Sequence, residues 1–319
     1  MIKDKKDNKE QPKVSVVIPT YNRSDTIGGA IKSVLNQTYQ NFEIVIIDDS
    51  SNDKTEKLVN AFNEKRIKYI KNEIRKNIPS GRNQGVKESG LDSKYIAFLD
   101  DDDEYLPLFL GKTIKRLEEK GELIGVTSSK ELRTQEHGKI KEEHCPKEPW
   151  RLGIGNGCVF RKELFEKENY WFNEKWPHFE EWDFGVRVLK NHKVECISEI
   201  LFIYHCSSLE EREERDSLYA SMSPEEIEHF YKNHYLLYSQ WGREALSYLC
   251  FYTGRLLLRF PEVKKGRKYL LKAFLTYPHP KYFLAYLASL VAPGLYQKSL
   301  KILIYNILHP SSWKRERKN

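Results

Sequence analysis

The stretch KYIAFLDDDD, residues 94–103, joins an apolar run to four consecutive carboxylates and decides the fold. Its first six residues are largely aliphatic and aromatic, which predicts a short buried strand. Four carboxylates at a strand end repel one another, and burying an unpaired charge is costly. Either a cation lies at the strand end, or the carboxylates form a solvated turn that caps the next helix. Carboxylate oxygens suit Mg²⁺ or Mn²⁺, which commonly share their ligands with a substrate's phosphates.

Strand and helix patterns alternate on the N-terminal side of this stretch. Strands are expected at Val14–Ile18, Phe42–Ile47, Ile67–Ile70 and Tyr95–Leu99, with helices at 27–35, 53–62 and 81–88. This alternation is typical of right-handed βαβ units, which build a mainly parallel sheet flanked by helices. Ligands bind such sheets outside the carboxyl ends of the strands. Polar clusters follow three of these strands, at 20–23, 48–51 and 100–103, so we expect one site built from all three.

The pattern is mixed from residue 104 onward. Strands are expected at Leu123–Thr127 and Val194–His205, and a helix at Glu180–Asn191. Residues 130–150 are charged and contain two prolines, which predicts a mobile loop. From about residue 223 the chain becomes rich in Tyr, Leu, Phe and Lys at helical spacing. We therefore expect a domain boundary near residue 215.

Composition limits the class of protein. A chain of 319 residues suffices for one large domain and a smaller one. The formal net charge of +7 favours polyanionic partners, meaning nucleic acid, anionic lipid or phosphorylated substrates. Part of the excess lies in lysines near the N-terminus, where a solubilising tail explains it equally well.

The cysteines and the apolar runs bear on location. Five cysteines are scattered without a Cys-x-x-Cys pair or metal-type spacing, and this odd, sparse set predicts a reducing compartment. The first residues are polar and charged, so no signal peptide is visible. No run of about 18 apolar residues occurs, so we expect no membrane-spanning helix.

Three segments together resemble the family 2 inverting glycosyltransferases with the GT-A fold. They are VSVVIPTYNR (14–23), LNQTYQNFEIVIIDDSS (35–51) and FLDDDD (98–103), in the family's order, and the match covers roughly residues 13–205. The resemblance implies an α/β GT-A fold, with a Rossmann-like, mainly parallel sheet flanked by helices and a C-terminal α-helical region. The implied domains are a polar arm at 1–12, a catalytic domain at 13–215 with a nucleotide-sugar half at 13–103 and an acceptor half at 104–215, and a helical region at 216–319.

The resemblance assigns the acidic strand end to a metal, Mn²⁺ or Mg²⁺. Asp102 would ligate the ion, and Asp100 would support it or contact the ribose. Asp101 could do either, because four aspartates in a row blur the motif's register. His205 could complete the metal's ligands, or be a surface histidine. Asp103 is expected to cap the helix beginning near Pro107, or to be solvated.

Five further positions resemble the donor-binding residues of the family. Pro19, Thr20 and Tyr21 match the segment that cradles the nucleotide base, although Tyr21 could also be an ordinary aromatic packed at a strand end. Asp49 matches the carboxylate that binds the base or the ribose. Arg82 lies in a segment resembling Gly-x-x-x-Ala-Arg-Asn and could reach a phosphate, or pair with a nearby carboxylate.

The segment FEEWDFGVR, residues 179–187, resembles the helix that carries the family's general base. That position is Glu181 here, where the family more often has Asp, and the departure leaves open whether Glu180 or Glu181 faces the acceptor. Asp183 and Arg187 are four residues apart and are expected to form a structural pair. A base on one side of the sugar and a metal-bound leaving group on the other predict inversion. A small-residue turn at 155–160 would let the backbone approach the donor sugar.

The C-terminal hundred residues show no clear family pattern. Residues 282–292 are apolar but too short to span a bilayer, and the end of the chain is basic and aromatic. These features fit a helix lying in a membrane interface, or equally a helical bundle packed on the catalytic domain. A membrane interface would suit a lipid-linked acceptor.

The sequence therefore predicts a metal-dependent glycosyltransferase that moves a sugar to a hydroxyl of a glycan or lipid-linked glycan, and the resemblance implies UDP, the family's commonest carrier, as the nucleotide of the donor. One alternative is a sugar nucleotidyltransferase, although PTYNR is not the Gly-rich loop expected after its first strand. Another is a non-catalytic scaffold that binds through its C-terminal helices. Nucleic acid is not expected as a partner, because the acidic clusters would repel phosphates at the ligand edge. The expected location is cytoplasmic, or peripheral at the inner face of the cell membrane.

Overall fold

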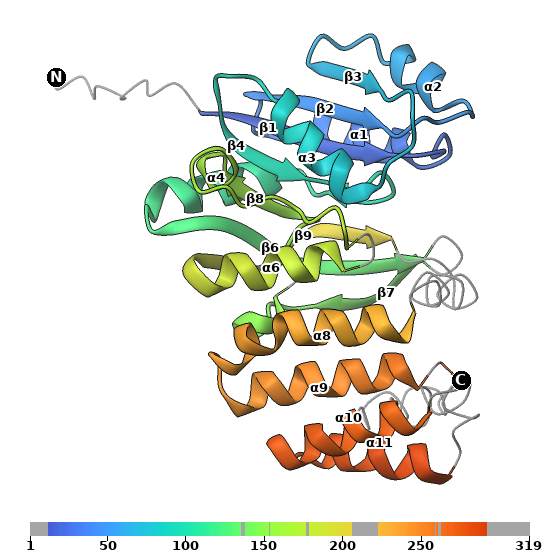
Figure 1. Cartoon of the computed structure of the whole chain (residues 1–319). Helices are drawn as coiled ribbons and strands as arrows, with labels where there is room; N and C mark the ends of the chain where they lie inside the picture. Colours follow the sequence, from blue (N-terminus) through green and yellow to red (C-terminus); the bar gives the residue numbers. More distant parts are fainter. Residues whose placement is uncertain are drawn as a thin grey trace, which may run out of the picture. The chain divides into compact units, whose positions relative to one another are not determined.

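The structure is a computed structural model that describes residues 12–134, 138–152, 154–176, 179–205, 223–258, 260 and 263–291. Residues 1–11 of the predicted polar arm (1–12) and the basic, aromatic chain end lie outside these ranges. The chain divides into two compact units, Met1–Arg212 and Glu213–Asn319, drawn in Figure 1.

The first unit is built on a mixed sheet. Its strands are β1 (Lys13–Thr20), β2 (Phe42–Asp48), β3 (Ile67–Lys71), β4 (Ser93–Phe98), β5 (Glu104–Tyr105), β6 (Leu123–Thr134), β7 (Gly138–Glu143), β8 (Cys158–Arg161) and β9 (Lys193–His205). Within the described residues their order is β3-β2-β1-β4-β8-β6-β9-β5, and β7 pairs with β6. The pairs among β3, β2, β1 and β4 are parallel, as is β6 with β9. The short β8 is antiparallel to both β4 and β6.

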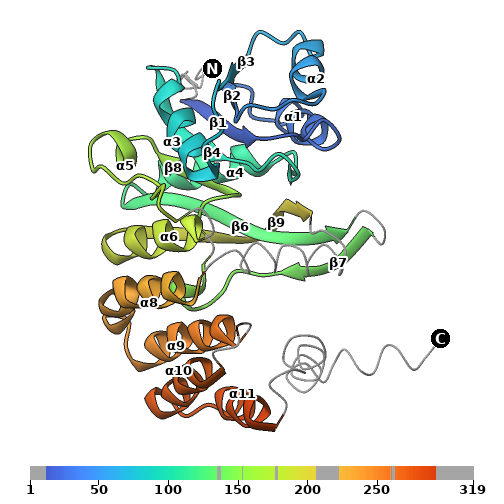
Figure 2. The same ribbon diagram turned by 45° about the vertical axis from the view of Figure 1, so that its right-hand side comes forward.

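Helices cover both faces of this sheet, as Figures 1 and 2 show. They are α1 (Ile27–Leu35), α2 (Thr55–Ala61), α3 (Ile78–Glu88), α4 (Phe109–Glu119), α5 (Glu163–Glu166) and α6 (Glu180–Asn191), with a short 3₁₀ turn, η1, at Pro149–Arg151. Side chains alternate along β1, so Val16 packs in a core with α1 and α4, whereas Val17 packs with α3 and α6. The predicted α/β fold with a mostly parallel sheet is confirmed.

One glycine sets how closely α3 approaches the sheet. A Cβ on Gly85 would lie 2.2 Å from a methyl carbon of Val17 in β1, a distance that real side chains do not tolerate. The absence of a side chain therefore lets α3 lie against β1. This close approach buries the adjoining turn of α3, which carries Arg82.

The prediction of a mobile loop over residues 130–150 is wrong for most of that range. Strand β6 continues to Thr134 and pairs with the antiparallel β7, with Lys130 opposite Glu143. The side chains of β7 are largely exposed, and ion pairs join the two strands, with Lys130 Nζ 3.6 Å from Glu143 Oε2 and Lys139 Nζ 3.5 Å from Glu131 Oε2. A charged, solvent-facing strand pair lacks the apolar alternation by which strands are recognised in a sequence.

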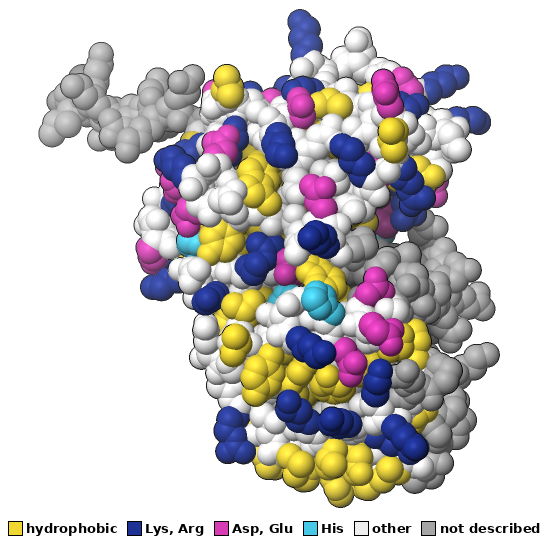
Figure 3. Space-filling view, in the orientation of Figure 1, with side chains coloured by type: hydrophobic (Ala, Val, Ile, Leu, Met, Phe, Trp, Pro, Cys, Tyr) yellow, Lys and Arg dark blue, Asp and Glu magenta, His cyan; other side chains and the backbone are white. Residues whose placement is uncertain are grey.

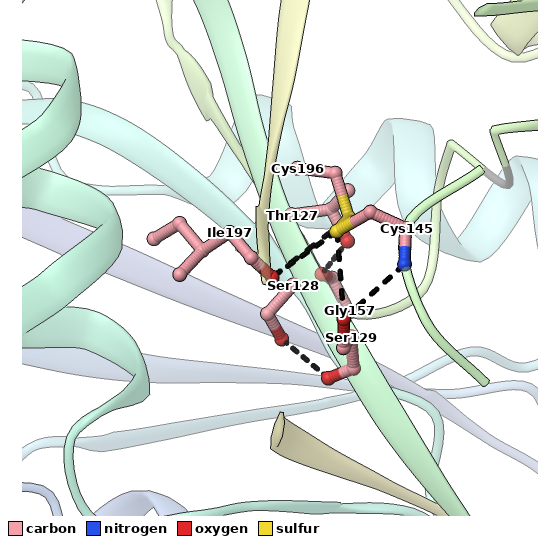
Figure 4. The surroundings of a disulfide bond; sticks show 7 residues. All are labelled: Thr127, Ser128, Ser129, Cys145, Gly157, Cys196 and Ile197. Atoms are coloured by element: carbon pink, nitrogen blue, oxygen red, sulfur yellow. Dashed lines mark hydrogen bonds between the residues drawn. A yellow bond between two sulfur atoms is a disulfide. The ribbon is translucent and has the colours of Figure 1, made fainter. Parts of the chain in front are cut away.

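A disulfide joins Cys145, which follows β7, to Cys196 in β9 (Figure 4). The backbone N–H of Cys145 donates to the hydroxyl of Ser129 in β6 at 3.2 Å, and the Cys145 sulfur lies 3.2 Å from the carbonyl oxygen of Ile197. Cys158 and Cys250 are buried and are not part of a disulfide. The sparse cysteines were expected to indicate a reducing compartment. This pair removes that argument, since a stable disulfide is typical of oxidising surroundings.

The described part of the second unit is helical, as predicted. It contains α8 (Pro224–Ser239), α9 (Arg243–Leu257), α10 (Val263–Thr276) and α11 (Pro280–Val291), which pack in chain order (Figure 1). Ser223 and Glu226 form a reciprocal capping box at the start of α8. Two glycines allow α9 and α10 to cross closely, because a Cβ on Gly254 would lie 2.9 Å from the carbonyl oxygen of Gly266. Among the described helices, none has the length and apolar character needed to cross a bilayer.

Candidate active site

The carboxyl ends of β1, β2 and β4 meet at one edge of the sheet. Thr20 lies opposite Asp48 in the parallel β1–β2 pair, and the backbone N–H of Asp49 donates to the Thr20 carbonyl at 2.9 Å. The backbone N–H of Leu99, just past β4, donates to the Val17 carbonyl of β1 at 3.1 Å. The three polar clusters found in the sequence therefore lie at the same edge.

The residues expected to hold a nucleotide base lie at the β1 and β2 ends of this edge. Pro19 is buried in β1 against Gly81 of α3, and Thr20 is also buried. Tyr21 is partly exposed, with the guanidinium carbon of Arg75 3.9 Å from its ring centroid. One face of the Tyr21 ring thus carries the flat guanidinium of Arg75, and stacking of Tyr21 on a nucleotide base stays a prediction.

Asp49 holds the segment that carries Arg75. Its two carboxylate oxygens both accept the backbone N–H of Lys76, at 2.8 and 2.9 Å. Asp49 and Tyr21 thus approach the same short segment, which follows β3. The role of Asp49 toward a base or ribose stays a prediction.

The four aspartates at the end of β4 have unequal surroundings. Asp101 is buried, and burial together with the neighbouring Asp102 carboxylate raises its pKa to about 7. The side chain of Asp102 is partly exposed. Arg23 faces both carboxylates, and its nitrogens lie 3.6 Å from Asp101 Oδ1 and 3.9 Å from Asp102 Oδ2. Arg23 is itself half exposed, so it neutralises this pair only weakly.

Asp103 is neither solvated nor a helix cap, so that prediction is wrong. It is fully buried, and its carboxylate accepts the backbone N–H of His205 at 2.7 Å and the side-chain amide of Asn156 at 2.5 Å. Burial and the neighbouring aspartates hold its pKa well above the ordinary value. The next helix, α4, begins at Phe109 without a side-chain cap from Asp103. Asp103 instead fastens the end of β9 to the acidic strand end.

His205 lies beside this acidic strand end at the last residue of β9. Its ring Nε2 is 2.9 Å from the Glu104 carboxylate, and its backbone contacts Asp103. The antiparallel pairing of β5 with β9 brings these residues together. Its assignment as a metal ligand stays a prediction.

Arg82 is the centre of a cluster of carboxylates. Its guanidinium is 1% exposed and pairs with Asp100 at 2.8 Å, Glu181 at 3.0 Å and Glu180 at 3.1 Å. The structure thus contains the carboxylate pairing that the sequence left open for Arg82. Contact with a donor phosphate stays a prediction. The cluster connects the strand end after β4 to the first turn of α6.

The two glutamates at the start of α6 differ in exposure. The side chain of Glu181 is 37% exposed, whereas that of Glu180 is 13% exposed. Burial is the largest influence on Glu180 and raises its pKa to about 7, with Arg82 acting in the opposite direction. Glu181 is therefore the glutamate that an acceptor could reach more easily. The expected pair behind them is present, with Arg187 nitrogens 2.6 and 2.8 Å from Asp183 Oδ2.

Asn156 was not singled out by the sequence, yet it joins both acidic segments. Its backbone N–H donates to Glu181 Oε1 at 2.7 Å, its side-chain oxygen accepts the backbone N–H of Asp100 at 2.9 Å, and its amide nitrogen donates to Asp103. A Cβ on the preceding Gly155 would lie 2.6 Å from Glu181 Oε1, so only glycine fits there. The one available signal was an asparagine between two glycines in the expected small-residue turn.

The donor set at the strand end fits a hard divalent cation. Two carboxylates, Asp101 and Asp102, lie together, and the nitrogens of the half-exposed Arg23 are 3.6 Å from Asp101 and 3.9 Å from Asp102. Within the described ranges no group of three His, Cys, Asp or Glu side chains is arranged to hold a metal ion. Mg²⁺ commonly takes only one or two carboxylates and completes its shell with water and substrate phosphates. Asp102, with Asp100 or Asp101, is the combination that could hold such an ion.

Comparison with known proteins identifies the family. The sequence profile described as Glycosyl transferase family 2 matches residues 15–169. An uncharacterized glycosyltransferase of Methanocaldococcus jannaschii is 30% identical over 211 residues, which cover 61% of this chain and 71% of that protein. The chain belongs to glycosyl transferase family 2. The predicted family and enzyme class are thereby confirmed.

Two further relatives are named as glucosyltransferases. A GalNAc(5)-diNAcBac-PP-undecaprenol β-1,3-glucosyltransferase of Campylobacter jejuni is 32% identical over 185 residues, covering 51% of this chain and 56% of the relative. A UDP-Glc:α-D-GlcNAc-diphosphoundecaprenol β-1,3-glucosyltransferase of Escherichia coli is 42% identical over 93 residues, covering 29% and 36%. This chain spans only part of these curated relatives, between a fifth and just over half of their length.

Solved structures of GT-A glycosyltransferases share the fold. S. aureus TarS in complex with UDP-GlcNAc superposes with a TM-score of 0.62 at 16% identity, covering 91% of both chains. The mannosyltransferase PcManGT of Pyrobaculum calidifontis, in complex with GDP-Man and Mn²⁺, gives a TM-score of 0.56 at 16% identity, covering 97% of this chain and 89% of that one. At this identity the likeness shows the GT-A fold.

Proposed function

We propose that this family 2 enzyme transfers a sugar from a nucleoside diphosphate sugar to a hydroxyl group of a glycan or lipid-linked glycan, with inversion. The observation that carries the proposal is the carboxylate cluster around Arg82. It holds Glu181 next to the acidic strand end, with Arg82 nitrogens 2.8 Å from Asp100 and 3.0 Å from Glu181. A base and a leaving-group site must lie this close together if both act on one sugar.

The donor would bind at the edge formed by β1, β2 and β4. In this proposal Tyr21 stacks on the base in the place that Arg75 now occupies, with Pro19 and Thr20 forming the floor and Asp49 binding the base or ribose. Residues 13–103 would thus hold the donor, and residues 104–215 would shape the acceptor side. UDP is the proposed carrier, because the name of the E. coli relative specifies UDP-Glc as its donor.

Glu181 would be the general base. A sugar hydroxyl loses its proton only as it attacks, so a carboxylate within hydrogen-bond reach is sufficient. Glu181 is partly exposed, and Asn156 and Arg82 hold one of its carboxylate oxygens, which leaves the other oxygen for the acceptor. Glu180 is more deeply buried and bonded to Arg82, which favours a structural role for it.

A divalent ion, Mn²⁺ or Mg²⁺, would neutralise the diphosphate as it leaves. Asp102 is the proposed principal ligand, with Asp100 and Asp101 beside it and His205 as a further candidate. Asp102 is the more exposed of the two carboxylates that face Arg23, which suits a ligand shared with a substrate.

A lipid-linked acceptor is proposed because two relatives are named for undecaprenol diphosphate substrates. Such an acceptor would place the enzyme at the inner face of the cell membrane, where nucleotide sugars are available. The disulfide between Cys145 and Cys196 gives no support to this location.

The proposal is tested by measuring thermal unfolding with a panel of nucleotides, with and without Mn²⁺. Ligands that bind the folded state raise the melting temperature. We expect UDP to do so only with metal, and Asp102→Ala to abolish the shift. The control is Asp92→Ala, which removes an exposed aspartate paired with Lys13 and should leave the nucleotide-induced shift unchanged. An equal shift without metal would contradict the site.

The role of Glu181 is tested by turnover. Glu181→Gln should reduce transfer by about two to four orders of magnitude, the usual contribution of a general base, while leaving the nucleotide shift intact. Glu163→Gln, an exposed glutamate of α5 that pairs with Lys167, is the matched control. Unchanged transfer by Glu181→Gln would remove it as the base. Release of pyrophosphate from a nucleoside triphosphate, rather than release of UDP, would favour the nucleotidyltransferase alternative.

A further inference from the structure

Helix α11 is apolar on two sides. Its inner side is buried, with Tyr282 at 4% and Ala285 at 0% exposure. Its outer side remains accessible although it consists of large apolar residues: Phe283 (41%), Leu284 (37%), Leu287 (39%) and Leu290 (45%). A helix of a globular protein normally presents polar residues on its outer side. The only charged residue of α11 is Lys281.

These exposed residues form one continuous stripe, which we call the α11 face: Phe283, Leu284, Leu287 and Leu290. Residues 283, 287 and 290 are spaced as neighbours on one helical side. The ring of Phe274 in α10 lies 5.0 Å from that of Phe283 and extends the apolar surface onto the neighbouring helix. In Figure 3, exposed hydrophobic side chains gather at the lower end of the view, and a row of Lys and Arg side chains lies above them.

The helices around this face are strongly basic. Among the described residues of α9 to α11 the only acidic one is Glu244, whereas eight are basic: Arg243, Arg255, Lys264, Lys265, Arg267, Lys268, Lys272 and Lys281. Lys264, Lys268 and Lys272 are exposed and four residues apart, so they line one side of α10. An apolar stripe on α11 and a basic stripe on α10, the helix packed beside it, match a surface that is apolar beneath and negatively charged above.

We propose that the helical unit docks on an anionic phospholipid bilayer through the α11 face. The apolar side chains would enter the boundary between headgroups and acyl chains, while the lysines of α10 contact the phosphates. A second copy of the chain fits less well, because it would bring two basic surfaces together. The inference goes beyond the proposed transfer reaction and depends on neither Glu181 nor Asp102.

The test is flotation of the full chain with lipid vesicles. One set contains phosphatidylcholine alone, and in the other phosphatidylglycerol replaces part of it. We expect the protein to float with the anionic vesicles and to be released by salt, because exposed charges are screened. Leu287→Glu should reduce the bound fraction about tenfold or more. It removes a leucine that the bilayer would bury and adds a negative charge that the anionic lipids repel.

Leu236→Glu is the matched control. Leu236 is 71% exposed on α8 of the same unit, so the chemical change is the same but lies outside the α11 face. It should leave vesicle binding unchanged. The double variant Lys264→Gln, Lys268→Gln should weaken binding to anionic vesicles about tenfold, and it keeps the test valid should Leu287→Glu fail to fold.

Three results would overturn the inference. The wild-type chain could fail to float with either set of vesicles, or Leu236→Glu could lose binding as strongly as Leu287→Glu. A concentration-dependent dimer that Leu287→Glu dissociates would assign the face to a second copy. The nucleotide-induced thermal shift should be the same in all these variants, so a failure here is separable from a failure of the proposed function.

Discussion

The two acidic segments of the site are Asp100–Asp103 after β4 and Glu180–Glu181 at the start of α6, and their carboxylates are arranged alike. Each contains a carboxylate that is buried and bonded to the protein, Asp103 and Glu180, and a more exposed one beside it, Asp102 and Glu181. Neighbours of like chemistry therefore differ in what they can do. Burial and hydrogen-bond partners, rather than residue type, separate structural carboxylates from those available to a substrate.

Both segments depend on Arg82, and its loss should have the largest effect on stability. Arg82→Met leaves three carboxylates without their shared counter-charge, and breaking a buried ion pair in this way typically costs about 3–5 kcal/mol. We expect that loss in the free energy of unfolding, measured with a chemical denaturant.

Arg66→Met is the control for this change. Arg66 pairs with Glu64 at 2.9 Å near the surface, where such pairs contribute about 0–1 kcal/mol. Similar losses in both variants would show that the two acidic segments do not rely on Arg82.

Asn156 is the second connection between the segments, and its loss should affect turnover more than binding. Asn156→Ala keeps the backbone N–H to Glu181 but removes the side-chain bonds to Asp100 and Asp103, which fix that backbone. Small misplacements of a catalytic group cost up to about 100-fold, so we expect kcat to fall by about 10-fold to 100-fold.

The distinguishing measurement is the division between kcat and KM. A positioning role predicts little change in the donor's KM or in the nucleotide-induced thermal shift. Asn191→Ala, whose amide contacts Tyr170 at the far end of α6, should leave both parameters unchanged. If the donor's KM rises and kcat stays constant, Asn156 contributes to donor binding instead.

Glu180 should give the smallest effect, and one that depends on pH. Its ordinary pKa of 4.5 is raised to about 7 by burial, so the folded state favours the protonated form. The stability linked to this shift is fully present below the ordinary pKa and is lost as the pH rises toward 7. Glu180→Gln cannot ionise and still accepts a bond from Arg82, so it should be about 1–2 kcal/mol more stable than wild type near pH 8.

That advantage should disappear near pH 4, where Glu180 is protonated in both states. Unfolding curves of the two proteins across this range provide the measurement, with Glu163→Gln as the control for the same chemical change at an exposed glutamate. A wild type that is more stable than Glu180→Gln at pH 8 would show that the ionised carboxylate, paired with Arg82, stabilises the fold.

Much of the N-terminal half was predictable, because each element there is written in a short apolar run. The expected strand Val14–Ile18 is observed as β1, Lys13–Thr20, and Phe42–Ile47 as β2, Phe42–Asp48. Buried parallel strands are apolar on both faces, so they stand out from their polar ends. The same polar ends marked the edge at which the site residues meet.

Residues beyond β4 were harder to predict, because their contacts connect distant parts of the chain. The partners of Asn156 lie 25 to 56 residues away, and the disulfide joins cysteines 51 residues apart. Strand β7 was missed since its charged side chains face solvent and resemble a loop. Asp103 was misjudged for the opposite reason, as a residue type that is usually exposed is here fully buried.

Sequence alone determined the α/β class, the family, the edge of the sheet that carries the polar clusters, and the two acidic segments, because local periodicity and contiguous motifs encode them. Only the tertiary structure decided which carboxylates are buried, that Arg82 joins the two segments, that Asn156 supports Glu181, and that α11 keeps an apolar side exposed. Burial and ion pairing are properties of three-dimensional neighbours, and those neighbours come from strands and helices that the chain brings together only on folding.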